Sequence, residues 1–397
     1  MSIKNLVVTY GGRSAEHDVS ILSGLHASRH VLGGARVHLV YLDRDNVMWV
    51  GAGLGNLDFY TPKNKKKFRG VSHAWFSDGY LYKRALLGRV KRVCKVDVVL
   101  NLCHGGVGEA GELASYLEMV NIPITSSQVL GAKKMMSKIL TREILVGEDW
   151  AQPEYTSISC SLPDVFPQDI VDADNNTSQE WGGMYGILSK FPLIVKPDTL
   201  GSSIGISIAR DVRELREAVE LALLFDGNMI VEEFLEGAIE VNCAGFKFHD
   251  DVLVSECEVV NKDGGSLFDF EKKYLGPAPQ MGKKHGQEEE IDEGLKPIFD
   301  EIKNLTRRAY ELFGASGVVR CDFLVKFDDQ KLPRIYLNEL NSVPGFLAYH
   351  LFHRAGMPYG VLIDMVSRQA IDEYKKRTKF EVRFPSEILK NNRTLVE

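Results

Sequence analysis

The stretch Arg320–Asn341, RCDFLVKFDDQKLPRIYLNELN, decides how the last third of the chain folds. Two runs rich in branched and aromatic residues flank the segment DDQKLP, whose residue types favour a tight turn. The pattern predicts an antiparallel hairpin centred between Gln330 and Lys331. Polar residues stand at the outer ends of both runs, where a core strand would normally carry Val or Ile.

The predicted hairpin sets Asp322 opposite Glu339 and Arg320 opposite Asn341. Because side chains alternate along a strand, all four project from one face. Facing carboxylates repel unless a cation or a proton lies between them, and oxygen ligands of this kind suit Mg²⁺. The hairpin therefore predicts a magnesium site. A slipped register, or a solvated face on which Arg320 neutralises a carboxylate, is the structural alternative.

Composition narrows the class of protein. The 397 residues suffice for two or three domains, and a net charge of -6 argues against a broad basic face for nucleic acid. The one basic run, KNKKK at Lys63–Lys67, is expected to be a solvated loop. The cysteines lack C-x-x-C spacing, and no apolar run is long enough for a secretory signal or a membrane helix. We expect reduced thiols, a cytoplasmic location and no membrane partner.

Strand and helix patterns alternate over the first 125 residues or so, which predicts an α/β domain with a parallel sheet. Its ligand-facing loops would be GGRSAEHD and CHGGVGEAG, after two of the strands. A more strand-rich, α+β region follows. We expect an N-terminal Rossmann-like domain at 1–128, a central region at 129–235 and a C-terminal region at 236–397. The tail from Phe380 has no clear periodicity.

A Gly-rich loop provides the second candidate site. Lys196 ends the apolar run PLIVKP, and the following DTLGSSIGIS offers small residues whose backbone N–H groups can surround phosphate oxygens. Lys138 and Lys273 could reach the same phosphates, although each alone also fits a surface lysine, and the loop alone fits a plain hairpin turn. The loop is not G-x-x-x-x-G-K-[ST], which argues against a P-loop enzyme, and no G-x-G-x-x-G follows the first strand, which argues against a dehydrogenase.

Six motifs in order now resemble the D-alanine–D-alanine ligases of the ATP-grasp superfamily, over roughly Asn5 to Asp364. They are GGRSAEHDVS, HGGVGEAGE, IVKPDTLGSSIGIS, EEFLEGAIEV, FDFEKKY and RCDFLVKF with IYLNELNSVPGF. The resemblance implies ATP held between central and C-terminal regions, each contributing an antiparallel sheet. It also implies amino-acid substrates and a homodimer.

The resemblance assigns roles residue by residue. Two Mg²⁺ ions, with Mn²⁺ as an alternative, would bind Asp322, Glu339 and Asn341. Phosphates, ribose and adenine would contact a set made of Lys138, Lys196, Ser203, Glu232, Glu233, Leu235, Glu240 and Lys273. Glu16, Ser202 and Tyr274 would form a hydrogen-bonded trio that orders the first substrate. Arg320 and the Gly345 N–H would donate to the oxyanion. His104 and His350 would bind substrate.

Structural interpretations stay open for two of these residues. His104 precedes a probable helix N-terminus, where a histidine can also be bonded into a turn. Glu16 lies near the first turn of a predicted helix, where a carboxylate is stabilised by the helix dipole alone.

The chain departs from the family pattern mainly on the acceptor side. Ser137 precedes the first lysine in place of the usual Asp, and Ala110 stands within the family's GEDG. Phe346–His350 replaces small hydroxyl residues, with His350 at the serine position, and the loop after Tyr274 is unusual. We expect an ATP-dependent ligase that joins D-alanine to D-alanine for peptidoglycan precursors. A related ligase with another amino-acid, hydroxy-acid or amine acceptor is the alternative, although Tyr274 favours an amine; an inactive nucleotide-binding regulator is a further one.

Overall fold

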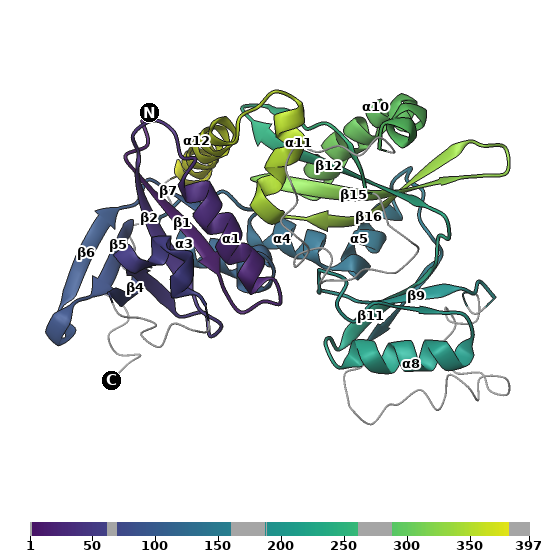
Figure 1. Cartoon of the computed structure of the whole chain (residues 1–397), viewed down its shortest axis with the longest axis horizontal. Coiled ribbons are helices and arrows are strands. Elements are labelled where there is room, and N and C mark those ends of the chain that lie inside the picture. The colour runs from purple at the N-terminus through teal and green to yellow at the C-terminus, as the bar shows by residue number, and fades with distance from the viewer. Residues whose placement is uncertain (1, 62–69, 160–186, 188, 261–287, 381–397) are drawn as a thin grey trace, which may run out of the picture.

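The computed structural model describes residues 2–61, 70–159, 187, 189–260 and 288–380. Three sheets organise these residues (Figure 1). The first has seven strands in the order β6-β5-β4-β3-β2-β1-β7. Its elements in chain order are β1 Asn5–Gly11, α1 His17–Ser28, β2 Arg36–Leu42, β3 Met48–Gly51, β4 Val71–Ser77, β5 Tyr80–Arg84, β6 Val90–Lys95, β7 Val98–Asn101, α2 Gly106–Glu109 and α3 Glu112–Met119.

Only part of this first sheet is parallel. β1 pairs in parallel with β2 and β7, as the alternating strand and helix pattern predicts. The strands β3 to β6, from the polar insertion, pair antiparallel, which the sequence analysis did not foresee. The sequence contained one signal for an antiparallel pair, the residues Asp78 and Gly79, because Asp-Gly is a favoured two-residue hairpin turn. Both residues adopt positive φ between β4 and β5. The sheet is therefore mixed.

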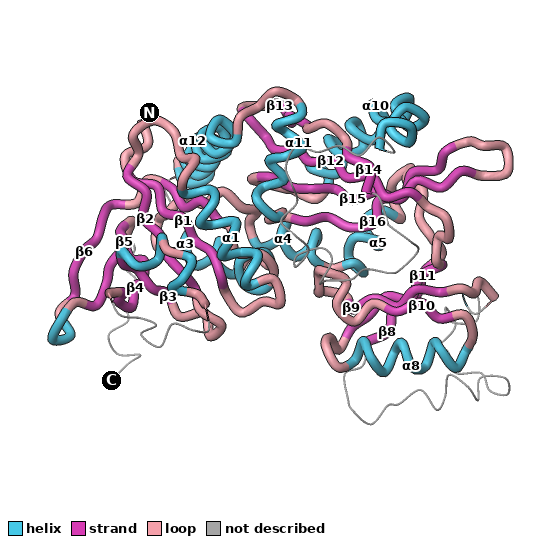
Figure 2. The backbone as a smooth tube through the Cα atoms, in the orientation of Figure 1, coloured by secondary structure: helices cyan, strands magenta, loops and turns pink. Residues whose placement is uncertain are grey.

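The second sheet, β10-β9-β11-β8, lies in the central region with α8 along one side (Figure 2). Its elements are β8 Tyr155–Ser159, β9 Leu193–Pro197, β10 Ser207–Ala209, α8 Val212–Leu223 and β11 Asn228–Glu233. Buried side chains of α8, such as Leu215 and Val219, pack on Val195 and Val231 in a separate core. This unit therefore has its own apolar interior.

The third sheet carries the predicted hairpin. Its path is β13-β12-β15-β16, and β14 also pairs with β12. The elements of this region, with the helices that pack around it, are α4 Val129–Met136, α5 Lys138–Leu145, β12 Ile239–Phe248, β13 Asp251–Val254, β14 Glu258–Val260, α10 Glu288–Leu312, β15 Val318–Phe327, β16 Pro333–Asn341, the 3-10 helix η7 Gly345–Ala348, α11 Tyr349–Arg354 and α12 Tyr359–Thr378.

One apolar core joins the first and third sheets. Val8 and Tyr10 of β1 share it with Phe246 of β12, Phe352 of α11 and Leu362 of α12. The N-terminal and C-terminal regions therefore pack as neighbours over a continuous interior, which fixes the loops that meet between them. None of the helices in the described ranges is long and apolar enough to span a membrane.

Candidate active site

The hairpin pairing at the polar ends is confirmed. Asp322 lies opposite Glu339 and Arg320 opposite Asn341. The predicted centre of the turn is wrong, because Phe327 pairs with Pro333 and the hairpin is centred on Gln330. A bulge between Asp322 and Phe323 corrects the register before the site is reached.

That bulge leaves Asn338 as the extra residue of β16, between Leu337 and Glu339. Its side-chain Oδ1 accepts a hydrogen bond of 3.0 Å from Lys196 Nζ on β9 of the central sheet. The sequence analysis missed Asn338, since strict alternation gives a bulged residue no partner. Its position before the Glu339 of the motif was the only available signal.

Asp322 is buried and fully engaged by neighbouring side chains. Arg320 donates to both of its carboxylate oxygens, at 2.6 Å each, and the Asn341 amide donates at 3.0 Å. Arg320 therefore neutralises the Asp322 carboxylate, as the structural alternative to a metal site predicts. The two carboxylates and one amide still form an oxygen donor set on one sheet face, and they could hold Mg²⁺, which prefers oxygen ligands.

Two of the lysines predicted to contact phosphates, Lys138 and Lys196, belong to the described residues. Both lie near the polar end of the hairpin. Lys196 is buried and also donates to Glu232 at 2.6 Å, while Lys138 donates to the Leu200 carbonyl at 2.7 Å. Burial, together with the neighbouring Lys196 charge, lowers the pKa of Lys138, against the opposing pull of Glu339. Lys273 and Tyr274 lie outside the described residues.

The substitution before Lys138 has a structural role here. Ser137 Oγ caps α5 by accepting from the Leu140 N–H, and it donates to the buried carboxylate of Asp198 at 2.9 Å. The same carboxylate accepts from the Ile139 N–H. Asp198 thus supplies from the Gly-rich loop the negative charge that Ser137 lacks at this helix start.

Glu232 is the centre of a buried charge network. Its carboxylate pairs with Lys196 and, at 2.5 Å, with Arg142 of α5. Burial alone would raise the pKa of Glu232, but the two cations outweigh burial and bring it to about 2. Arg142 also donates to the Leu337 carbonyl, so it connects the central sheet to the hairpin. Sequence reasoning missed Arg142, which carries no motif of its own.

Two cavities meet at Glu339. One, of about 420 Å³, lies between the central and C-terminal sheets and contains a large share of the predicted nucleotide set: Lys196, Ser203, Glu232, Glu233, Leu235 and Glu240, together with Ser202. The other, of about 240 Å³, is lined by Glu16, Glu109, Lys138 and Asn341. Asn338 and Glu339 border both.

Glu16 and Ser202 are brought together as predicted. Ser202 Oγ donates to Glu16 Oε1, although 186 residues separate them. The Glu16 side chain makes no capping bond to its own helix, although it stands at the N-cap of α1, where the helix dipole also stabilises a carboxylate. Ser202 and Ser203 both adopt positive φ, of 55° and 59°, an uncommon conformation that functional loops often hold.

His104 is placed differently from a side chain that faces a ligand. It is buried, its Nδ1 lies 2.7 Å from the Val343 carbonyl, and its Nε2 lies 2.7 Å from Ser23 Oγ. Both ring nitrogens are thus engaged within the protein. Glu109, which sequence reasoning did not select, accepts from the backbone N–H groups of Gly105 and Val343. Burial and then the charge of Glu16 raise the pKa of Glu109 to about 7.

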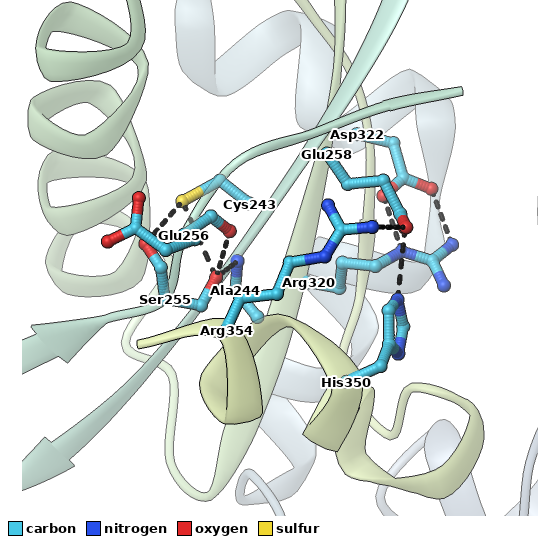
Figure 3. Close-up of polar contacts among 9 residues, drawn as sticks. All are labelled: Cys243, Ala244, Ser255, Glu256, Glu258, Arg320, Asp322, His350 and Arg354. Carbon is cyan, nitrogen blue, oxygen red and sulfur yellow. Dashed lines mark hydrogen bonds and ion pairs between the residues drawn. The ribbon is translucent and has the colours of Figure 1, made fainter. Parts of the chain in front are cut away.

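Gly345 begins η7 after a short link from the end of β16 at Asn341, and His350 follows in α11. Figure 3 shows Glu258 of β14 between His350 and Arg354, with Arg320 and Asp322 beside it. His350 Nε2 lies 3.0 Å and Arg354 lies 3.1 Å from the two oxygens of Glu258. Burial alone would raise the pKa of Glu258, but these two neighbours lower it. Sequence reasoning missed Glu258 and Arg354.

A cavity between two antiparallel sheets, lined by Lys196, Glu232 and Glu339, fits one class of protein, the enzymes of the ATP-grasp fold. Family models described as D-ala D-ala ligase N-terminus and D-ala D-ala ligase C-terminus match residues 5–127 and 169–368. The chain belongs to the D-alanine–D-alanine ligase family.

Individual relatives agree with this assignment. The chain is 33% identical over 349 residues to a D-alanine–D-alanine ligase of Nitratiruptor sp., covering 87% of this chain and 89% of the relative. It is 30% identical over 382 residues to one of Thermosipho africanus, covering 94% and 95%. The solved D-alanine-D-alanine ligase of Coxiella burnetii shares the fold, with a TM-score of 0.73 at 20% identity over 95% of this chain and 97% of the other.

Proposed function

We propose that this enzyme uses ATP to join two amino acids through an acyl phosphate, with D-alanine as donor and acceptor, for peptidoglycan precursors. One observation carries the proposal: Glu339 and Asn338 border both the cavity with the predicted nucleotide set and the cavity with Glu16. A γ-phosphate at this junction would lie next to a carboxylate bound in the small cavity. Family membership supports the same assignment.

The large cavity would hold ATP. The segment Glu232–Leu235, which runs out of the end of β11, would face adenine, Glu240 the ribose, and Lys196 the phosphates. An ammonium group has three donors, and Lys196 directs two of them to Glu232 and Asn338, so one remains for a phosphate oxygen. Lys138 would approach the transferred phosphate from the small cavity.

Asp322, Glu339 and Asn341 would hold Mg²⁺, and the metal would supply neutralisation of phosphate charge. Asp322 would have to share its oxygens with Arg320, which now occupies both. When one of these oxygens turns to the metal, the Arg320 guanidinium would shift toward the reacting carbonyl. The family's two ions, with Mn²⁺ as a substitute, are part of this proposal.

The first step would be attack of the D-alanine carboxylate oxygen on the γ-phosphate, which forms the acyl phosphate and releases ADP. Glu16 at the small cavity would bind the donor's ammonium group, and its bond to Ser202 would close the Gly-rich loop over the reactants. The second step would be attack of the acceptor amine on the acyl carbon, with loss of phosphate. Arg320 and the Gly345 N–H would donate to the developing oxyanion.

One observation favours a second candidate, a related ligase with a different acceptor. His350 stands where the family pattern has a small hydroxyl residue, and it shares Glu258 with Arg354, so the acceptor side carries more charge than that pattern implies. A carboxylate-bearing acceptor still fits, because histidine and arginine both donate to carboxylates. A homodimer and a cytoplasmic location are also part of the proposal.

The deciding experiment measures phosphate release from ATP over a panel of D- and L-amino acids, singly and in pairs, with mass detection of the products. We expect D-alanine alone to give D-alanyl-D-alanine in a Mg²⁺-dependent reaction. A product only with a different acceptor would replace the first assignment by the second. Absence of any ATP-dependent product across the panel would refute both.

A further inference from the structure

Three consecutive residues after Gly345 adopt a left-handed conformation. Phe346, Leu347 and Ala348 have φ values of 52°, 55° and 48°. Residues with a Cβ atom rarely adopt this conformation and do so at an energetic cost, so the surrounding structure must impose it. This turn carries the Gly345 N–H that the proposed mechanism places at the oxyanion.

The backbone around Gly345 is held by side chains of the N-terminal region. The Val343 N–H donates to Glu109 Oε1 at 3.2 Å, and the Val343 carbonyl lies 2.7 Å from His104 Nδ1. On the other side of Gly345, the Phe346 N–H donates to Ser23 Oγ at 3.0 Å. We call Ser23, His104 and Glu109 the clamp. It fixes three backbone groups within three residues of Gly345, from partners more than two hundred residues away in sequence.

The direction of each hydrogen bond in the clamp follows from the chemistry of its members. A carbonyl oxygen only accepts, so His104 Nδ1 must carry the hydrogen that points to Val343. Burial lowers the pKa of His104, which favours the neutral ring, and Nε2 then accepts from the Ser23 hydroxyl. The Ser23 oxygen keeps its lone pairs for the Phe346 N–H. Each hydrogen-bond donor in this series, from the Phe346 N–H through the Ser23 hydroxyl to His104 Nδ1, therefore has an acceptor.

We propose that Ser23, His104 and Glu109 are positioning residues that aim the Gly345 N–H at the oxyanion of the second step, and that His104 acts through the loop without contacting substrate. The proposal rests on the proposed ligase function. The first step depends on other groups, namely the lysines and the acidic hairpin. Loosening the clamp should therefore slow attack by the amine more than formation of the acyl phosphate, which water then hydrolyses.

The test variant is Ser23→Ala, and helix α1 offers a matched control, Ser20→Ala. Both serines are 0% exposed. Ser20 Oγ accepts from the Gly11 N–H at 2.7 Å and donates to the Leu102 carbonyl at 2.6 Å, so its bonds resemble those of Ser23 but do not touch the acceptor loop. Both variants should lose thermal stability to a similar extent.

The readout is the ratio of phosphate released to dipeptide formed, together with hydrogen exchange of the peptide that spans residues 343–348. We expect the ratio to rise about tenfold and exchange to quicken in Ser23→Ala, and neither to change in Ser20→Ala. Glu109→Gln, which keeps the side-chain shape, should raise the ratio of phosphate to dipeptide in the same way. It is the test variant if Ser23→Ala does not fold.

A ratio that stays at one phosphate per dipeptide in the clamp variants, or one that rises equally in Ser20→Ala, would overturn the proposal. Failure of the proposed function looks different. The wild-type enzyme would then consume no ATP with D-alanine or join D-alanine to another acceptor. In the latter case the ratio is measured with that acceptor. If the wild type joins nothing, the clamp has no reaction to position and the inference falls too.

Discussion

Replacing Glu232 by Gln tests the buried charge network under the nucleotide cavity. The side chain is 2% exposed and pairs with Arg142 and Lys196, so the variant leaves two buried cations without their anion. A pKa near 4.5 in the unfolded chain against about 2 in the folded protein corresponds to about 3 kcal/mol at neutral pH. Breaking a buried ion pair typically costs about 3–5 kcal/mol, which agrees.

The expected effect on melting follows from chain length. Unfolding entropy of about 2.1 cal/mol/K per residue over 397 residues converts a loss of about 3 kcal/mol into a drop of roughly 4 °C, and more if the central unit melts by itself. Calorimetry of wild type and Glu232→Gln measures this difference. The matched control is Glu154→Gln, because Glu154 and Lys190 form an exposed pair at 3.0 Å, which is expected to contribute little.

The same variant has a defined pH dependence. A carboxyl whose pKa is lowered by folding stabilises the protein above its unfolded pKa, and that stabilisation is lost as the pH falls toward the folded value. The melting difference between wild type and Glu232→Gln should therefore be full above about pH 5 and shrink between pH 4.5 and about 2. A variant as stable as wild type at pH 7, or a difference that does not change on acidification, would refute the role given to the ion pairs.

Two further substitutions address the chemistry. Glu339→Gln should lower Mg²⁺-dependent dipeptide synthesis by about a hundredfold, since it removes a charge at the junction of the cavities; near-normal turnover at saturating Mg²⁺ would contradict the metal site. Arg354→Ala should raise the KM for the acceptor about tenfold by loss of a charged donor, whereas Arg368→Ala, in a surface pair with Asp364, should not; equal KM values would remove Arg354 from acceptor binding.

Two causes explain why the polar pairs of the hairpin were predicted correctly: the alternation of side chains along the strands, and a bulge that the sequence did not predict. Alternation along two strands places Asp322 and Glu339 on one face wherever the register holds. The predicted turn centre was wrong, and the bulge at Asn338 restored the expected register. Bulges depend on contacts with other elements, here the bond from Lys196, and no local pattern contains them.

Long-range hydrogen bonding is where sequence reasoning fell short. A histidine after a strand fits a ligand and a turn equally well, and only the folded chain shows that Val343 and Ser23 take both nitrogens of His104. The antiparallel half of the first sheet was missed for another reason. Each of the strands β3 to β6 has at most one buried residue, so their burial pattern is weak and the Asp78–Gly79 turn was the one clear sign.

The arrangement of the apolar cores suggests a hypothesis about which part of the enzyme moves. The first and third sheets share one apolar interior, so the walls that they give the small cavity are rigid, whereas Thr199, Leu200 and Gly201 of the central region line its other side. The central sheet has its own core and meets the rest largely through polar contacts, including those of Lys196 with Asn338 and of Ser202 with Glu16. Hydrogen bonds between partly buried groups exchange with water at a smaller net cost than the separation of packed apolar side chains. We therefore expect the large cavity to open by rotation of the central unit, and the contact between Ser202 and Glu16 to form and break with each turnover while the clamp around Gly345 stays closed.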